Sequence, residues 1–337
     1  MEDQRIPFLT LQEVLAKVLV QYQFSAENAE LSAHLFAQSS LDGVPSHGLN
    51  RFLSYLNFIK KGLIDVHAHP ETIASFGAFE RWDGLLGPGN INAHLAMDRC
   101  LELAKSSGIG CVALQNTNHW MRAGNFGWQA VEAGCIGICF TNTKPNMPAW
   151  GGSEPKLGNN PLVVAIPRQK GPVVLDMAMS QFAYGKMAIY EKEGKELPYE
   201  AGFDQSGKLT KSPKEIIEHE LALPIGLWKG AGLSLMIDML AVLLSGGEAT
   251  HEVGKSGEEY GLSQVFVALD PNKFGMKEWM EEKSDGIIGD LSRSATFDGK
   301  GKVRYPGENT LKIREENMEK GVPVDIDIWN GILSLIE

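Results

Sequence analysis

The residues best suited to chemistry lie in one early turn, Gly43-Val-Pro-Ser46-His47-Gly48-Leu-Asn-Arg51. Arg51 follows His47 by four residues, a spacing that places two side chains on the same side of a helix. Arginine binds carboxylates through paired N–H donors, and histidine exchanges a proton near neutral pH. The pair suits an anionic carbonyl substrate, with Arg51 holding its carboxylate and His47 protonating its carbonyl oxygen. A structural histidine beside a surface arginine is the alternative.

Two further polar clusters could complete such a site. Gln115-Asn-Thr-Asn118-His119-Trp120-Met-Arg122 follows an apolar run that predicts a buried strand, and α/β proteins bind ligands at strand ends. It offers a second imidazole, His119, although a polar turn around a packed tryptophan would look the same. Trp228-Lys229-Gly230-Ala-Gly232 leads into an apolar helix, where free backbone amides and a lysine attract phosphate. A simple glycine turn is the alternative there.

A different chemistry is suggested by Asp65-Val-His67-Ala-His69. Side chains two residues apart in a strand share a face, so His67 and His69 could bind a metal, as in metal-dependent amidohydrolases. That site would need further ligands on later strands, and the histidines that remain lie in polar segments. Solvated loop histidines are the alternative, and we predict no metal.

Standard nucleotide-binding loops are absent from the sequence. The glycines of Gly84-Leu-Leu-Gly87-Pro-Gly89 have the wrong spacing for a Rossmann fingerprint. A phosphate-binding loop ending at Gly254-Lys255-Ser256 would need a glycine where the chain has Ala249. If the chain binds a dinucleotide, it uses a different arrangement.

Composition excludes several classes of protein. With 337 residues, 43% hydrophobic and 22% charged, the chain can bury a full core. Its net charge of −11 disfavours nucleic-acid binding, because an acidic surface repels phosphates. The apolar stretch Leu233–Leu244 is too short for a membrane span and contains Asp238. The start of the chain resembles no signal peptide and the four cysteines form no disulfide pattern, so we expect a cytoplasmic protein.

The clusters must be positioned by an α/β core flanked by helices. Apolar spacing predicts three helices before Gly62, the first begun by a capping box at Thr10–Glu13, the second capped by Ser25 and the third by Ser46. Strands and helices begin to alternate near residue 71. We predict strands at Ile73–Phe76, Cys111–Gln115, Ile136–Thr141, Leu162–Ile166, Val173–Met177 and Gln264–Leu269, and helices at Ile91–Ser106, Gln181–Glu191, Leu233–Ser245 and Lys273–Ser284.

Two parts of the chain are expected. Residues 1–70 should form a helical part that carries the Ser46-His47-Gly48 turn and packs with residues 305–337, which read as two helices. Residues 71–304 should form the α/β core, with a polar surface excursion near 195–225.

Taken together, the clusters resemble the type-2 malate/L-lactate dehydrogenase family, which is unrelated to the Rossmann lactate dehydrogenases. The matching segments occur in the family's order and cover nearly the whole chain. They are Ser46-His47-Gly48 with Arg51, Gln115–His119, Leu157–Pro161, Leu175–Ser180 and Gly230–Gly232. Longer runs, such as Asn118–Arg122 and Trp228–Gly230, are similar to the branch of the family that reduces open-chain sugar acids.

The resemblance implies a non-Rossmann mixed-sheet fold, a homodimer, and NADH, with NADP less expected, bound in an extended cleft near the partner subunit. It implies reduction of a 2-oxo sugar acid, with a malate- or lactate-type 2-hydroxy acid as the alternative. His47 would be the proton donor, with Arg51, His119 and Asn118 binding substrate, although His119 could also be the main donor. The implied cofactor contacts are Pro172, Val173, Val174, Leu175, Asp176, Met177, Ala178, Trp228, Lys229, Gly307, Glu308 and Asn309.

Overall fold

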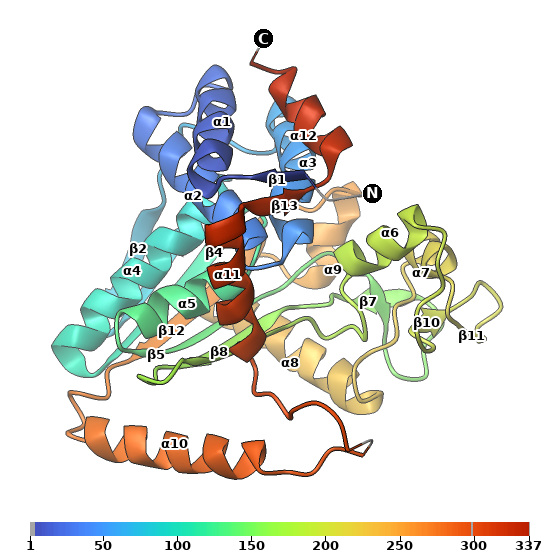
Figure 1. Cartoon of the computed structure of the whole chain (residues 1–337). Helices are drawn as coiled ribbons and strands as arrows, with labels where there is room; N and C mark the ends of the chain where they lie inside the picture. The colour runs from blue at the N-terminus through green and yellow to red at the C-terminus, as the bar shows by residue number, and fades with distance from the viewer. Residues whose placement is uncertain (1–3, 298, 337) are drawn as a thin grey trace.

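The computed structural model describes residues 4–297 and 299–336, and a seven-stranded sheet lies at its centre (Figure 1). The strands are β2 (Glu71–Phe76), β3 (Phe79–Asp83), β4 (Ile109–Thr117), β5 (Ile136–Thr141), β8 (Leu162–Ile166), β9 (Val173–Met177) and β12 (Leu262–Leu269). They lie in the order β2-β3-β4-β12-β5-β8-β9, with β3 and β4 parallel and the other neighbours antiparallel. The predicted mixed α/β fold is confirmed, and β9 forms one edge of the sheet.

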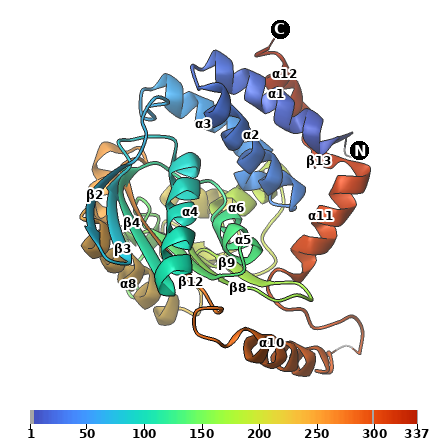
Figure 2. The same ribbon diagram turned by 90° about the vertical axis from the view of Figure 1, so that its left-hand side faces the viewer.

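Helices cover both faces of this sheet. They are α4 (Gly89–Ser107) and α5 (Gly124–Glu132) on one face and α8 (Trp228–Ser245) on the other, as Figure 2 shows. Val112 of β4 and Phe266 of β12 are buried on the first face, and their chain neighbours Ala113 and Val265 on the second. Because successive strand residues face opposite sides, the central strands are continuous apolar runs.

The two ends of the chain form a second, helical layer. Its helices are α1 (Phe8–Gln21), α2 (Ala26–Leu41), α3 (Leu49–Lys60), α11 (Glu308–Lys320) and α12 (Ile326–Leu333). Strand β1 (Gln4–Ile6) pairs antiparallel with β13 (Val322–Val324) and joins the termini. Leu15, Phe52 and Trp329 lie in the shared apolar core, so the C-terminal segment stabilises the helices that carry the His47 turn.

Helix starts were predicted with mixed success. Ser25 caps α2 as expected, with its Oγ accepting from Asn28 N at 3.2 Å. The capping box at Thr10–Glu13 is wrong, because α1 begins at Phe8, after Pro7. Phe8 is buried with the rest of the apolar stripe of α1, which extends the helix toward the N-terminus.

Two elements of the central sheet and its covering helices escaped prediction for physical reasons. Strand β3 carries Glu80 in its middle, and its carboxylate accepts a hydrogen bond from Arg99 Nη2 at 2.8 Å, which offsets the cost of burying it. Helix α5 contains Gly124 and Gly127, residues that indicate a turn. Gly127 permits close packing there, since a Cβ would lie 2.6 Å from Val163 Cγ1 of β8.

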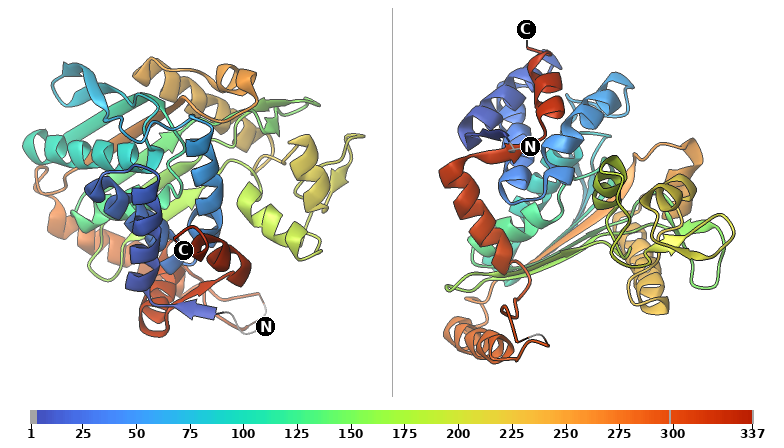
Figure 3. Two further views of the ribbon diagram at one scale, coloured as in Figure 1. Left: turned by 90° about the horizontal axis from the view of Figure 1, so that it is seen from above. Right: turned by 45° about the vertical axis from the view of Figure 1, so that its right-hand side comes forward.

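The surface excursion near 195–225 is a small lobe. It follows α6 (Tyr184–Lys192) and contains β10 (Gly202–Phe203), β11 (Leu209–Thr210) and α7 (Pro213–His219). Figure 3 shows α6 and α7 on the side of the sheet away from α4 and α5. The remaining short elements are β6 (Met147–Pro148), β7 (Pro155–Leu157) and α9 (Thr250–Val253), with 3₁₀ turns at Pro45–His47 and Gly254–Ser256.

Helix α10 (Lys277–Ser292) stands apart from the main body in Figure 1. It has no buried residue. It is joined to the β8–β9 hairpin by an ion pair between Arg168 Nη1 and Asp285 Oδ1 at 2.9 Å. Its contacts with this hairpin are therefore ionic and hydrogen-bonded.

Among the helices that the structure describes, α8 is the one long and apolar enough to cross a membrane, judged by length and composition. A single such helix is weak evidence for a span. Asp238, in the middle of α8, accepts hydrogen bonds from Asn142 Nδ2 and Thr250 N, each at 3.0 Å. Ser234 Oγ donates to Gly158 O at 2.6 Å. These bonds hold α8 against α9 and the segments that follow β5 and β7.

Candidate active site

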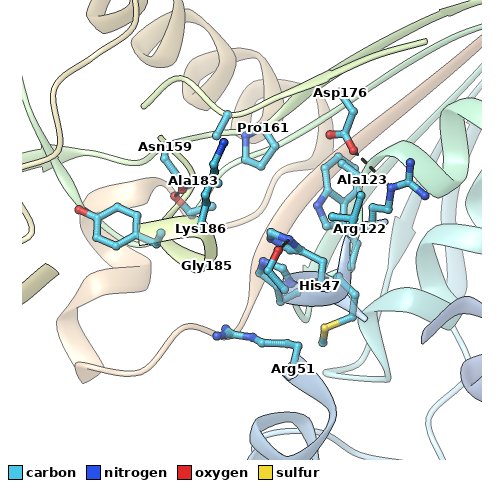
Figure 4. Close-up of a pocket in the computed structure, with 18 of the residues that line it drawn as sticks. His47, Arg51, Arg122, Ala123, Asn159, Pro161, Asp176, Ala183, Gly185 and Lys186 are labelled. Atoms are coloured by element: carbon cyan, nitrogen blue, oxygen red, sulfur yellow. Dashed lines mark hydrogen bonds and ion pairs between the residues drawn. The ribbon is translucent and has the colours of Figure 1, made fainter. Parts of the chain in front are cut away.

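A cavity of about 1030 Å³ lies between the N-terminal helices, the edge strand β9 and helix α6. Three residues of the predicted site line it together: His47, Arg51 and His119. Figure 4 shows His47 near the middle, between Asp176 on one side and Lys186 on the other. The structure therefore brings together side chains from segments that are distant in the sequence.

The turn that carries His47 is held tightly against α2. Leu49 N donates to Ser40 Oγ at 2.9 Å, which satisfies an amide at the start of α3. Gly48 is required there, because a Cβ would lie 2.2 Å from the same hydroxyl oxygen. Ser46, predicted to cap α3, does not cap it; its Oγ lies 3.1 Å from His47 Nδ1. Ser40 has taken over the capping contact, which leaves Ser46 beside the imidazole.

His119 lies beside His47 with the rings nearly parallel, 6.1 Å between centroids and 17° between planes. Met121 N donates to His119 Nδ1 at 2.9 Å. A nitrogen that accepts carries no proton, so the neutral ring is protonated on Nε2. Burial, together with the positive charges of Arg51 and His47, holds the pKa of His119 well below its usual value. His119 is therefore a neutral hydrogen-bond donor at physiological pH.

The charges around His47 differ from those around His119 in one respect. Burial lowers its pKa, the Asp176 carboxylate raises it, and Arg51 and Arg122 lower it. Asp176 stabilises the imidazolium of His47 and is not among the charges that act on His119. Of the two histidines, His47 is the better placed to hold and transfer a proton.

Arg51 projects from the first turn of α3 into the cavity, below His47 in Figure 4. Among the described residues its guanidinium has no hydrogen-bond or ion-pair partner. Guanidinium groups in proteins remain charged and bind carboxylates through two parallel hydrogen bonds. Arg51 is therefore available to hold the carboxylate of a ligand beside the two imidazoles.

Asn118, predicted to bind substrate, is placed differently. It is buried and does not line the main cavity. Its Nδ2 donates to the backbone oxygens of Leu63, Leu86 and Gly87 at 3.1, 2.7 and 3.1 Å. The side chain therefore fixes the loop that presents His119, and it acts on the cavity through that loop.

Arg122 was not predicted as a site residue, and it links the two loops of the site. Its Nη1 forms an ion pair with the fully buried Asp42, at the end of α2. Asp42 also accepts from Arg314 Nε of α11 at 2.7 Å. Arg122 Nε lies 3.8 Å from Asp176 Oδ2, across the edge of the cavity. No short sequence pattern could have revealed this network, because each partner comes from a different element.

Half of the predicted cofactor contacts line the cavity. They are Val174, Leu175, Asp176, Met177, Ala178 and Gly307. The remaining six, among the described residues, do not: Pro172, Val173, Glu308, Asn309, Trp228 and Lys229. Glu308 forms an ion pair with Lys302 at 2.6 Å, and Asn309 accepts from Arg304 at 3.2 Å. Trp228 and Lys229 begin α8, which the sequence had predicted to start at Leu233.

The β9 wall has features that fit a nicotinamide cofactor. Strand β9 is an edge strand. Val174 N on its outer side donates to Pro306 O at 3.0 Å, and the other outward backbone groups can pair with an amide or hydroxyl. Gly307 lies against it with φ +87°, where a Cβ would be 3.1 Å from Val174 N. Because Gly307 has no side chain, its backbone can approach β9 closely and leave room for a flat ring. The volume of the cavity also exceeds that of an ordinary single-ligand pocket.

The opposite wall contains polar residues that the sequence did not single out. Lys144 and Glu220 form an ion pair at 2.6 Å, and Lys144 N donates to Glu259 Oε2 at 3.2 Å. Burial raises the pKa of Glu259, although Arg51 and Lys144 oppose the shift. All three line the cavity, and they come from three separate loops.

His67 and His69, the basis of the metal-hydrolase alternative, lie in an exposed loop. His67 N donates to Asp65 Oδ1 at 2.9 Å, a local turn contact. Within residues 4–297 and 299–336, no group of three or more His, Cys, Asp or Glu side chains could hold a metal ion. The structure offers no support for the hydrolase alternative.

Comparison with known proteins bears on the whole chain. Residues 6–333 match the family model described as malate/L-lactate dehydrogenase. The 2,3-diketo-L-gulonate reductase of Citrobacter koseri is 42% identical over 333 residues, covering 98% of this chain and 100% of that protein. The Klebsiella pneumoniae protein of the same name is 42% identical over 332 residues, with 98% and 100% covered.

Solved structures of dehydrogenases are similar to this chain over nearly its whole length. Malate dehydrogenase from Entamoeba histolytica superposes with a TM-score of 0.94 at 28% identity, covering 99% of this chain and 97% of that one. Sulfolactate dehydrogenase from Methanocaldococcus jannaschii gives 0.89 at 30% identity, with 98% and 96% covered. These relatives are named as dehydrogenases or reductases of hydroxy or oxo acids, and the family suggests a nicotinamide cofactor. The chain is an oxidoreductase that belongs to the malate/L-lactate dehydrogenase family.

Proposed function

We propose that this protein reduces 2,3-diketo-L-gulonate to 3-dehydro-L-gulonate with NADH. The observation that carries the proposal is the convergence of His47, His119 and Arg51 in one cavity beside β9. The substrate is the one named for relatives about 42% identical over their full length. A carboxylate ligand, a carbonyl hydrogen-bond donor and a proton donor are the groups that reduction of a 2-oxo acid requires.

The roles follow from the geometry. Arg51 binds the C1 carboxylate and orients C2 toward the imidazoles. His119 donates its Nε2–H to the C2 carbonyl oxygen and polarises the bond. A bound nicotinamide supplies the hydride that reaches C2. His47, protonated and facing Asp176, transfers its proton to the same oxygen, and the hydroxyl of the product is formed.

We propose NAD rather than NADP as the cofactor. Support comes from the wall formed by β9 and residues 306–310. Among the described residues, this wall brings one acidic side chain, Asp176, and no cationic side chain to the cavity. A 2′-phosphate is normally recognised by arginine or lysine. The measurement is kcat/KM with NADH and with NADPH, and a preference for NADPH would overturn this choice.

The test of the substrate is the loss of NADH absorbance with purified protein and 2,3-diketo-L-gulonate, run beside pyruvate and oxaloacetate. We expect fast turnover of the diketo acid and slow turnover of the other two. Activity on the smaller acids alone would favour the alternative, a malate- or lactate-type 2-hydroxy-acid dehydrogenase. A lack of turnover with all three substrates would contradict the proposed chemistry.

We further propose that the protein is a homodimer formed through α8. Support comes from apolar side chains exposed along one face of that helix, where Trp228 is 63% and Leu243 74% exposed. The same face includes Met236 and Met239. Trp228 and Lys229 lie outside the cavity of their own chain, so cofactor contact by them would require the partner's cleft.

Light scattering tests the dimer. We expect twice the chain mass of 36.9 kDa for the wild type and a single chain for Met239→Glu/Leu243→Glu, with weakened NADH binding. A monomeric wild type would contradict the proposal. A cytoplasmic location is proposed on the four free cysteines, which suit a reducing compartment. Export of the native protein to an oxidising compartment would contradict that location.

A further inference from the structure

The cavity contains charged groups that the reaction at C2 does not use. Lys144, in the loop after β5, and Glu220, at the end of α7, form an ion pair at 2.6 Å. Both side chains line the same cavity as His47 and are about one third exposed, at 33% and 35%. An ammonium has three donors and a carboxylate accepts at several positions, so each group retains capacity for a ligand after pairing.

A third polar group that lines the cavity lacks a partner. Asn146 lines the cavity and is 7% exposed. Its Nδ2 donates to Asn159 Oδ1 at 3.0 Å, and its backbone oxygen accepts from Tyr184 Oη, so the residue is held in place. Its Oδ1 is buried with no hydrogen-bond partner among the described residues. A buried acceptor without a donor is costly, and a ligand hydroxyl would satisfy it.

The backbone at Glu220 is also unusual. Glu220 ends α7 with φ +54° and ψ 37°, a left-handed conformation that non-glycine residues seldom adopt. Glycine is the common residue at such a helix end. Glycine would fit this backbone better, but the chain has a glutamate there, and its carboxylate pairs with Lys144 in the cavity.

We infer that Lys144, Glu220 and Asn146 form a subsite for the hydroxyl groups of the substrate's tail. This inference rests on the proposed function, since it describes how the same site recognises a polyhydroxy 2-oxo acid. Hydroxyls donate and accept at once, and the subsite presents one donor group, Lys144, beside two acceptor groups. With β9 occupied by the cofactor and Arg51 by C1, the tail extends toward the side of the cavity where Asn159, the partner of Asn146, lies across from Asp176 (Figure 4).

The subsite also explains which acids are disfavoured. The negative charge of Glu220 already pairs with Lys144 and would oppose a second carboxylate at the same ammonium. A dicarboxylate such as oxaloacetate would place its distal carboxylate against this wall. A short acid such as pyruvate would leave the pair without contact. The wall therefore favours a hydroxylated tail over both alternatives.

The test compares kcat/KM for 2,3-diketo-L-gulonate, pyruvate and oxaloacetate in Glu220→Gln and Lys144→Met. Each variant is expected to lower the ratio of diketo acid to pyruvate by roughly tenfold or more, the size of a hydrogen bond to a charged group. Glu220→Gln should also raise the ratio of oxaloacetate to pyruvate, because the repelling charge is gone. Ratios cancel any general loss of active protein.

The matched control is Lys195→Met. Lys195 pairs with Glu193 at 2.7 Å on the same lobe, outside the cavity. It should change neither ratio. Unchanged ratios in Glu220→Gln, which is isosteric and keeps its fold most readily, would overturn the subsite while the proposed function stands. A wild type that reduces pyruvate but not the diketo acid would overturn the proposed function and the subsite with it.

Discussion

Two polar loops meet at the cavity, and they use their polar residues differently. The first, residues 43–51, directs His47 and Arg51 into the cavity while backbone and glycine contacts hold the turn. The second, residues 115–124, directs His119 inward and uses Asn118 and Arg122 to hold itself against neighbouring segments. One loop supplies the reacting groups, and the other supplies mainly their support.

The difference shows what decides whether a polar residue in a cluster is functional. Asn118 is engaged because three backbone carbonyl oxygens lie around its amide, and such oxygens need donors. Arg51 has no partner among the described residues, so its donors remain for a ligand. A side chain whose donors are used within the fold, such as Asn118 Nδ2, holds its loop in place, whereas one whose donors remain available can bind a ligand.

Removal of Arg122 is expected to have the largest effect on the fold. Arg122→Met leaves the buried Asp42 with Arg314 as its remaining cation, so the free energy of unfolding should fall by about 3 kcal/mol, the lower end for breaking a buried pair. Chemical denaturation measures it. The control is Arg293→Met, which removes an exposed pair and should cost less than about 1 kcal/mol. Equal losses in both variants would show that the network does not support the loop.

Removal of Arg51 should affect binding rather than folding. Arg51→Ala loses a charge-assisted contact worth about 1.5–3 kcal/mol of transition-state binding. The value of kcat/KM for pyruvate or the diketo acid should therefore fall roughly ten- to hundredfold. Pyruvamide, which lacks the carboxylate, serves as the matched substrate and should lose much less. If both substrates lost activity equally, Arg51 would not be the carboxylate ligand.

The pH profile should show a smaller effect. His47 must be protonated to act in reduction, and its pKa lies below the usual value because burial and the two arginines outweigh Asp176. The value of kcat/KM for reduction should therefore fall as pH rises through a value below about 6.5. The value of kcat/KM for the reverse oxidation should rise over the same range. Arg122→Met should move this limb to higher pH and Asp176→Asn to lower pH. Movement in the opposite directions would contradict the charge assignment.

The sequence predicted the parts of the fold that depend on local patterns. Strands β5, β8 and β9 have the expected bounds because each is a short, mostly apolar run, although Asp176 lies within β9. Strand β3 was missed because a buried glutamate interrupts its pattern, and that glutamate is compensated by Arg99 on α4. The compensation joins two elements and leaves no local signal.

The same limit applies to the site. His47 and Arg51 could be paired because they lie four residues apart on one helix start. Lys144 and Glu220 meet only after the lobe folds over the cavity, so nothing in their own segments indicates the pair. Asn118 looked like a ligand because the carbonyl oxygens that it serves come from another segment.

The most direct test of the account is a single-turnover comparison of His47→Asn and His119→Asn, with enzyme preloaded with NADH and mixed with 2,3-diketo-L-gulonate. We predict that His47→Asn slows NADH oxidation by roughly 10²–10⁴-fold while NADH binding, followed by its fluorescence, is retained. His119→Asn should lose less, since the asparagine amide still offers a neutral N–H donor to the carbonyl oxygen. The reverse order would make His119 the proton donor and contradict the assignment of roles between the two loops.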